Sequence, residues 1–219
     1  MKKYKYLFWD LDGTIVNTFE GITKSFAYAL EFYGIHITDM NDLRPVIGPP
    51  LHDCFVSMFG FDDVKATEAV EKYRERYNNT YMQESELYDG IKETIQKLAF
   101  YGFKNVLATA KPQHFADGLL DYYGLADSFC FVAGASLDKS RDSKVKVLQY
   151  ITDTLKITDM SEVVMIGDRK FDLLGAAHFG IDGIGVLYGF GSEEELSNSP
   201  NIYLAKDAKG LYNYIIDSH

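Results

Sequence analysis

Residues 6–16 read YLFWDLDGTIV, an apolar run that ends in two aspartates, Asp10 and Asp12, with glycine and threonine directly after them. A short continuous apolar run of this kind is typical of a buried strand in a parallel sheet. Both carboxylates would then stand at the C-terminal end of that strand, which is where open α/β sheets bind ligands. The stretch therefore indicates the fold class and the place of a functional site together.

Further apolar runs of strand length follow, at residues 105–108, 129–133, 163–166, 183–187 and 202–204. Helical patterns separate most of them, such as the face formed by Ile91, Ile95 and Leu98. Strands that alternate with helices predict an α/β fold, here a Rossmann-like three-layer core with a parallel sheet between two layers of helices.

The interval between the first two strands breaks this alternation. Residues 18–86 contain no convincing strand, and two helical apolar stripes flank a loop rich in proline and glycine at residues 45–50. We therefore predict a small all-helical cap, residues 18–86, inserted after the first strand into a core formed by residues 1–17 and 87–219. A strand-to-strand crossover needs far fewer residues, which favours a lid over the carboxylates. The alternative is a stabilising insertion with no role in chemistry.

Composition narrows the choice of partners and compartment. The chain has 219 residues, a formal net charge of −10 and no basic cluster, so a nucleic acid polymer is not an expected partner. It has no apolar stretch of membrane-spanning length, and its two cysteines form no C-x-x-C pair. Residues 1–9 are basic with only a short apolar run, so we do not expect them to act as a secretory signal. We expect a cytoplasmic protein that acts on a small molecule. An aromatic content of 15% is compatible with a monomer or a homodimer.

The spacing of Asp10 and Asp12 favours a divalent cation. Two carboxylates this close repel each other unless a cation or a shared proton relieves them. Mg²⁺ prefers oxygen ligands, commonly one or two carboxylates together with a substrate phosphate. A calcium loop does not fit, because the twelfth position counted from Asp10 is Gly21 rather than glutamate. A helix-capping aspartate followed by a turn aspartate is the purely structural alternative.

A second acidic cluster, Asp168 and Asp172, follows the apolar run at residues 163–166. Asp168 would stand at a strand end in the same way as Asp10, and three carboxylates would converge if the two strands are neighbours. Each residue also has a local explanation, because Asp168 would serve as a helix N-cap and Asp172 would be an acid favoured by the dipole in the first helical turn.

Thr109 and Lys144 are candidates for binding an anion. Thr109 ends a predicted strand and precedes Ala110, and a hydroxyl beside the free N–H groups of a helix start forms an anion site. Pro112 suits the first helical position, and a helix cap is the simpler explanation of Thr109. Lys144 stands at a predicted helix start, where its charge opposes the macrodipole. That cost suggests neutralisation of an anion, although a solvated surface lysine is the alternative.

These elements, in their order along the chain, resemble the motifs of the haloacid dehalogenase-like hydrolase superfamily. The resemblance covers nearly the whole chain, including the helical insertion, which is similar to the alpha-helical cap of that family. Three further segments, at residues 20–25, 47–51 and 188–196, are most similar to phosphoglycolate phosphatase-like enzymes and their 5'-nucleotidase-like relatives. The motif residues are Asp10–Thr14, Thr109, Lys144, Gly167 with Asp168, and Asp172.

The resemblance implies a mechanism. Asp10 would attack phosphorus and form an aspartyl-phosphate, while Asp12 would protonate the leaving alcohol and then deprotonate water. Mg²⁺ would be bound by Asp10, by the main-chain carbonyl of Asp12 and by Asp168, with Asp172 supporting its waters or holding Lys144. Family members that cleave carbon–halogen or phosphonate bonds lack an acid at the position of Asp12, so this residue favours phosphate esters.

The same resemblance assigns substrate contacts. Thr109, Ala110 and Lys144 would bind the phosphoryl oxygens, and Gly13 would let the backbone approach them closely. Arg44, in the insertion, is a candidate for reaching the substrate. We expect a Mg²⁺-dependent phosphatase for a small-metabolite monoester, similar to phosphoglycolate phosphatase. A 5'-nucleotidase for nucleoside monophosphates, a sugar phosphomutase and a catalytically silent binding module are the alternatives.

Overall fold

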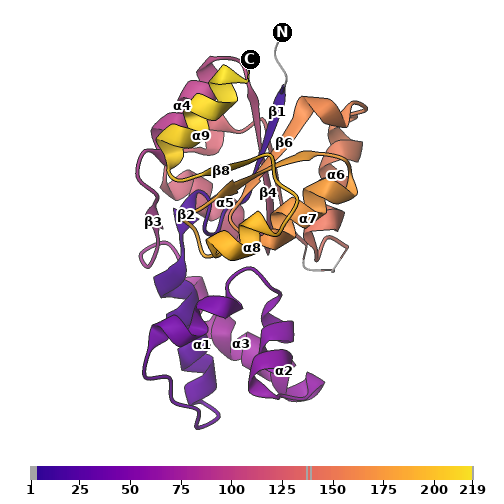
Figure 1. The fold of residues 1–219 in the computed structure, drawn as a ribbon. Coiled ribbons are helices and arrows are strands. Elements are labelled where there is room, and N and C mark those ends of the chain that lie inside the picture. The colour runs from indigo at the N-terminus through magenta and orange to yellow at the C-terminus, as the bar shows by residue number, and fades with distance from the viewer. Residues whose placement is uncertain (1–3, 137, 139, 219) are drawn as a thin grey trace. The chain divides into compact units, whose positions relative to one another are not determined.

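A computed structural model describes residues 4–136, 138 and 140–218, and the chain divides into two compact units. The first unit comprises Met1–Asn17 and Leu87–His219, and the second comprises Thr18–Glu86. The first contains the sheet and the second is helical (Figure 1). The boundary between them falls where the sequence pattern changes.

The first unit is built on a six-stranded sheet in the order β5-β4-β1-β6-β7-β8. Every neighbouring pair in this sheet is parallel, and β1 lies between β4 and β6 with all four of its residues buried. The predicted parallel α/β fold is therefore confirmed. The strands are β1 (Tyr6–Trp9), β4 (Lys104–Pro112), β5 (Phe131–Ala135), β6 (Val163–Gly167), β7 (Asp182–Val186) and β8 (Tyr203–Ala205).

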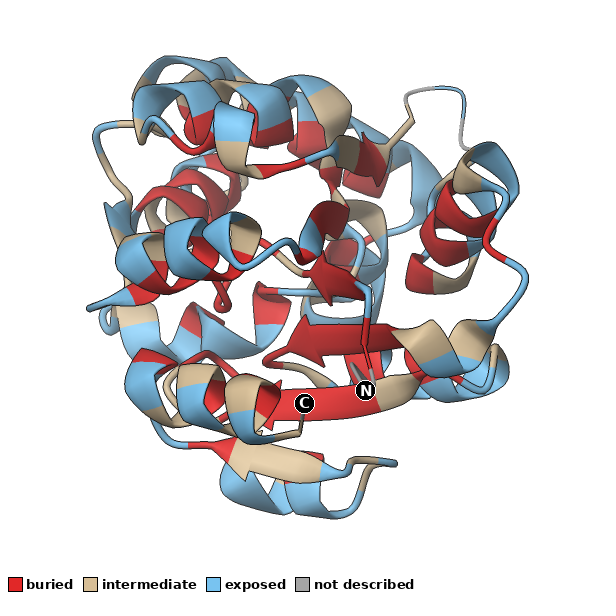
Figure 2. Ribbon diagram, turned by 90° about the horizontal axis from the view of Figure 1, so that it is seen from above, coloured by how far each residue is buried: buried red, intermediate tan, exposed pale blue. Residues whose placement is uncertain are grey.

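Helices cover both faces of the sheet, and the buried positions of the strands lie between them (Figure 2). Phe8 packs on one face with Val147 and Leu148 of α6 and with Ala176 of α7. Helix α4 lies on the opposite face, where Asn105 of β4 donates a hydrogen bond to it. Helix α9 packs against α4. The helices of this unit are α4 (Ile91–Phe100), α5 (Gln113–Tyr122), α6 (Lys144–Leu155), α7 (Lys170–His178), α8 (Glu193–Ser197) and α9 (Ala208–Asp217), with short 3-10 turns at Ala126–Ser128 and Met160–Glu162.

A buried polar network holds β1 in register with β4. The indole N–H of Trp9 donates to Oδ1 of Asn105 at 3.0 Å. The Asn105 amide donates in turn to the backbone carbonyls of Ile95 and Ser128, both at 3.1 Å. Buried polar groups are costly unless they are paired, so this network fixes which residues of the two strands lie side by side. The network therefore holds β1 at Trp9, the residue directly before Asp10.

The second unit is a small helical bundle with an aromatic core. Its elements are α1 (Phe19–Glu31), η1 (Met40–Val46), α2 (Leu51–Phe59) and α3 (Asp63–Thr80). The ring of Phe26 on α1 lies 4.7 Å from that of Phe55 on α2 and 5.2 Å from that of Tyr73 on α3. The helical insertion after the first strand is confirmed. A two-stranded sheet of β2 (Val16–Asn17) and β3 (Glu86–Leu87) joins the segments where the chain leaves and re-enters the first unit.

The structure corrects three local expectations. The proline-rich region is not only a loop, because it contains η1 and is followed directly by α2, for which Pro50 is the N-cap. Thr109 does not end its strand, since β4 continues through a register shift to Pro112. Pro112 accordingly caps α5 rather than forming its first residue. No helix in the described part of the chain is long and apolar enough to cross a membrane.

Candidate active site

Asp10 and Asp12 lie in a tight turn that follows β1. The backbone N–H of Asp10 still donates to Ile166 of the neighbouring strand β6, at 2.9 Å. Beyond it the chain folds back, and the N–H groups of Thr14, Ile15 and Val16 all donate to the single carbonyl of Leu11. The turn therefore places both carboxylates at the C-terminal edge of the sheet, with side chains that are 13% and 16% exposed.

Three carboxylates converge at this edge, as the sequence predicts. Asp10 follows β1, Asp168 follows β6, and Asp172 stands in the first turn of α7. One oxygen from each lies within 4.8 Å of the others, and Asp168 and Asp172 are fully buried. Their convergence results from the adjacency of β1 and β6 in the sheet. The purely local explanations of these aspartates do not account for this arrangement.

The electrostatics of the cluster favour the binding of a further cation. Burial, reinforced by the charges of Asp172 and Asp10, raises the pKa of Asp168 well above its usual range. Burial also raises the pKa of Asp172 to about 6, although Lys144 opposes the shift. An added positive charge among the three groups would favour their ionised forms.

The donor set fits Mg²⁺. All three groups offer hard carboxylate oxygens, the type of ligand that this ion prefers. Oδ1 of Asp10 and Oδ1 of Asp172 are buried and make no hydrogen bond of good geometry within the described residues, although both lie at ion-pair distance from Lys144. Oxygens of this kind are available to a metal ion. Asp10, Asp168 and Asp172 are thus the side chains that would hold one or orient its waters.

Lys144 is a buried cation of the site. Its Nζ lies 2.9 Å from Oδ1 of Asp10 and 2.7 Å from Oδ1 of Asp172, and it donates to the carbonyl of Ala108 at 2.6 Å. Burial alone would lower the pKa of this lysine, but the charges of Asp10 and Asp172 outweigh burial and raise it. A solvated surface lysine is therefore the wrong explanation of this residue, and its unfavourable place at the start of α6 is offset by two carboxylates.

A loop after β7 encloses Asp168. The N–H of Phe190 donates to Oδ2 of Asp168 at 2.7 Å, and the hydroxyl of Thr14 donates to Oδ1 at 3.2 Å. A Cβ at Gly189 would lie 2.3 Å from the carbonyl oxygen of Gly13 and 2.3 Å from Cβ of Asp168, so no larger residue fits there. Apart from the family resemblance, nothing in the sequence predicts this loop. The signal that could have revealed it is the pair of glycines, Gly189 and Gly191, shortly after the end of β7.

Sequence reasoning also missed Lys111. Its Nζ lies 3.0 Å from Oδ1 and 3.2 Å from Oδ2 of Asp12, and its side chain is only 4% exposed. The available signal was a lysine just past the apolar part of a predicted strand.

The remaining predicted residues are placed as follows. Thr109 is buried within β4, where its Oγ1 accepts the backbone N–H of Lys111 at 3.2 Å, and Ala110 beside it is half-buried. Gly13 adopts a φ of +84° and leaves room for Oδ2 of Asp168, which a Cβ would meet at 2.1 Å. Arg44 lies in η1 of the helical unit with an exposed side chain, and its reach to the substrate stays a prediction.

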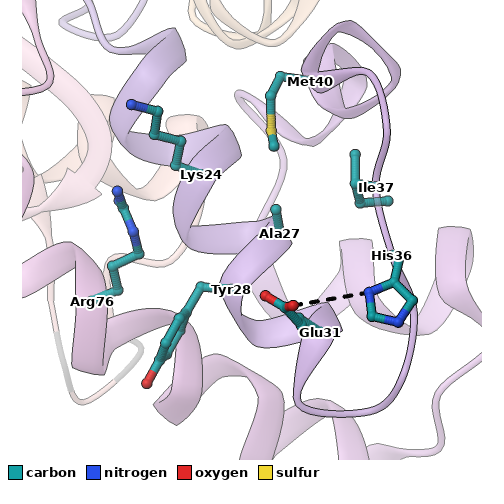
Figure 3. A pocket seen from close by; sticks show the side chains of 8 residues that line it. All are labelled: Lys24, Ala27, Tyr28, Glu31, His36, Ile37, Met40 and Arg76. Atoms are coloured by element: carbon teal, nitrogen blue, oxygen red, sulfur yellow. Dashed lines mark ion pairs between the residues drawn. The ribbon is translucent and has the colours of Figure 1, made fainter.

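The helical unit has a pocket of its own, of about 300 Å³ (Figure 3). Its cations are already paired. Lys24 lies 2.5 Å from Oε1 of Glu20, and Arg76 donates to both oxygens of Glu84 at 2.6 Å. The pocket therefore offers no charge comparable with that of the aspartate cluster. It is lined by Lys24, Ala27, Tyr28, Glu31, His36, Ile37, Met40 and Arg76.

The fold and its strand-end aspartates define an α/β enzyme. The chain belongs to the haloacid dehalogenase-like hydrolase family, whose model matches residues 7–186. A crystal structure described as a predicted phosphatase from Clostridium acetobutylicum superposes with a TM-score of 0.93 at 38% identity, covering 98% of this chain and 99% of that one. The predicted family and the predicted enzyme class, a phosphatase-type hydrolase, are confirmed.

Individual relatives differ in what they are named for. A 5'-nucleotidase of Pseudomonas aeruginosa is 39% identical over 99% of this chain and 97% of its own length. The tyrosine-protein kinase PtkA of Mycobacterium tuberculosis is 36% identical over 84% of this chain and 62% of its own length. A phosphoglycolate phosphatase of Vibrio vulnificus is 26% identical over 99% of this chain and 98% of its own length.

Proposed function

We propose that this enzyme is a Mg²⁺-dependent phosphomonoesterase in which Asp10 is the nucleophile. The observation that carries the proposal is the convergence of Asp10, Asp168 and Asp172 at the C-terminal edge of the sheet, with the ammonium of Lys144 against Asp10 and Asp172. A carboxylate nucleophile is repelled by an anionic phosphate unless cations screen both groups. This arrangement places one such cation against Asp10 and holds oxygens suited to a second.

The reaction proceeds in two displacements. An oxygen of Asp10 forms a bond to phosphorus as the bond from phosphorus to the ester oxygen breaks, and Asp12 gives a proton to that oxygen so that it leaves as an alcohol. Asp12 then takes a proton from a water molecule, whose oxygen attacks phosphorus and releases Asp10 and inorganic phosphate. Mg²⁺, when bound by Asp10, Asp168 and the main-chain carbonyl of Asp12, supplies screening of negative charge.

Other residues bind the transferred group. Lys144 neutralises charge on the phosphoryl oxygens, as Thr109 and the backbone at Ala110 hydrogen-bond to them. Gly13 keeps the turn free of a side chain, so the backbone approaches these oxygens closely. In this proposal residues 18–86 act as a lid, and Arg44 is their candidate contact with the substrate.

The substrate is a small phosphate monoester. Sequence segments favour both a phosphoglycolate phosphatase-like and a 5'-nucleotidase-like enzyme. The relative named as a 5'-nucleotidase is the more similar of the two, at 39% identity against 26%. We therefore place nucleoside 5'-monophosphates first in the order of testing and phosphoglycolate second. We further propose that the enzyme is cytoplasmic and works as a monomer or homodimer, which light scattering of the purified protein would distinguish.

The test is phosphate release from a panel of monoesters, with Mg²⁺ and after chelation by EDTA. We expect release that depends on the metal, is lost in Asp10→Asn and falls to a low residual rate in Asp12→Asn, variants close in shape to the native side chains. Release no greater than that of Asp10→Asn would contradict the proposal. A sugar phosphate isomerised without phosphate release would indicate a mutase instead. Turnover that survives both substitutions would place the chemistry outside this site and restore the binding-module alternative.

A further inference from the structure

Lys111 lies close to Asp12, and the proposed mechanism assigns no cation to the carboxylate of this residue. The two aspartates of the turn are served by different lysines, since Lys144 contacts Asp10 whereas Lys111 contacts Asp12. The Nζ of Lys111 is within 3.2 Å of both carboxylate oxygens of Asp12. A buried ammonium is costly unless it is paired, so an interaction this well enclosed is not incidental.

The backbone holds Lys111 at this place. It lies near the end of β4, within the register shift against β5 between Ala108 and Pro112. Its N–H donates to Oγ1 of Thr109, a residue already proposed to bind the phosphoryl group. The strand thus delivers a hydroxyl and an ammonium to the same edge of the sheet as the carboxylates that follow β1.

We propose that Lys111 is a positioning residue for Asp12. It holds the Asp12 carboxyl group in the orientation from which this group gives and takes its proton. The inference rests on the role proposed for Asp12. A cation that contacts both oxygens restricts rotation of the side chain, and proton transfer in the transition state depends steeply on such orientation. Lys111 neither gives nor takes a proton. The proton passes from Asp12 to the ester oxygen and returns to Asp12 from water.

The dependence on leaving group separates this role from others. Benzyl phosphate and p-nitrophenyl phosphate are similar in shape, but the nitrophenolate leaves without help from an acid, whereas benzyl alcohol needs a proton. The value of kcat/KM reports the steps up to release of the alcohol. We expect Lys111→Met to lower kcat/KM for benzyl phosphate about 100-fold. For p-nitrophenyl phosphate we expect little change.

A double-mutant cycle gives a second readout. In an Asp12→Asn background, Lys111→Met should cause no further loss with benzyl phosphate, because the group that it positions is already gone. Lys104→Met, at the exposed start of the same strand, is the matched control and should leave both substrates unaffected. Should Lys111→Met fail to fold by circular dichroism, Lys111→Arg keeps the charge with altered geometry. It should show the same selective loss in weaker form.

Equal losses for the two esters, additive losses in the cycle, or a raised KM at unchanged kcat would each overturn the proposal. The last result would mark Lys111 as a substrate contact instead. These outcomes differ from failure of the proposed function, in which Asp10→Asn would keep its activity toward both esters.

Discussion

The ammonium of Lys144 lies 2.9 Å from Oδ1 of Asp10, so the nucleophile proposed for this enzyme rests against a buried cation. The same ammonium lies 2.7 Å from Asp172 and donates to Ala108. One side chain from α6 therefore joins the turn after β1, strand β4 and helix α7 at the point where the chemistry is proposed. Its removal should affect stability and catalysis together.

Lys144→Met should lower the free energy of unfolding by about 3 kcal/mol, because the carboxylates that it neutralises would remain buried without it. Denaturant titration without added metal measures this loss. Lys146→Met, on the same helix with an exposed ion pair to Asp142, should change stability by less than about 0.5 kcal/mol. Adding Asp172→Asn to Lys144→Met should recover part of the loss, and fully additive effects would show that the two groups are not coupled.

Gly189→Ala should weaken Mg²⁺ binding by about 10- to 100-fold, because the added methyl group would displace the carboxylate of Asp168 that the loop encloses. Isothermal titration of the metal-free protein with MgCl₂ measures the affinity without relying on turnover. Gly34→Ala is the control, because its methyl group would meet no atom within 4 Å, although its φ of +76° adds backbone strain that Gly189 does not have. Equal affinities in wild type and Gly189→Ala would mean that the loop does not shape the metal site.

Glu84→Gln should destabilise the helical unit in a manner that depends on pH. The two hydrogen bonds from Arg76 hold the pKa of Glu84 below its ordinary value of 4.5. A lowered pKa in the folded state contributes stability above the unfolded pKa, and this contribution is lost as the pH falls through the folded value. We expect a difference of about 1 kcal/mol at neutral pH, given partial solvent screening, and its disappearance in acid.

Denaturant unfolding at neutral and acidic pH measures the effect of Glu84→Gln. The exposed pair of Glu71 with Arg74 provides the comparison, and Glu71→Gln should have little effect at either pH. A deficit in Glu84→Gln that stays constant across the pH range would assign it to packing rather than charge.

Asn105→Ala should lower the free energy of unfolding by about 2–4 kcal/mol, since it leaves the buried indole N–H of Trp9 without its acceptor and opens a small cavity. Trp9 is the single tryptophan of the chain, so its fluorescence reports this environment directly. Asn198→Ala, at an exposed position, should be nearly neutral. An unshifted emission maximum with unchanged stability would argue against a structural role for the network.

Much of this architecture could be predicted because its signals are local. The apolar run before Asp10 and the run before Asp168 each identify a buried strand and the edge at which it ends. The residues at which strands end were harder to predict from the sequence, since continuation of β4 past Thr109 depends on its pairing with β5. The helix α2 was hidden by the prolines that precede it, of which Pro50 proves to be an N-cap.

The parts of the site that could not be predicted depend on contacts distant in sequence. Nothing near Lys111 in the chain indicates that Asp12 will be its partner, because their meeting requires β4 to lie beside β1. The contact of Phe190 with Asp168 likewise requires β7 to follow β6 in the sheet. Local sequence patterns predict where the strands are, whereas the order of the strands in the sheet determines which side chains come into contact.

The helical insertion has a consequence for how the chain folds. Strands β1 and β4 pair directly, Trp9 beside Leu107, yet the whole insertion lies between them in sequence. If the bundle forms first and β2 pairs with β3 at its base, about 70 residues drop out of the loop that must close, which lowers the entropic cost by about 1 kcal/mol. The folded insertion would then shorten the loop that must close before β1 and β4 pair. Recovery of activity during refolding would therefore lag behind formation of the aromatic core of the insertion.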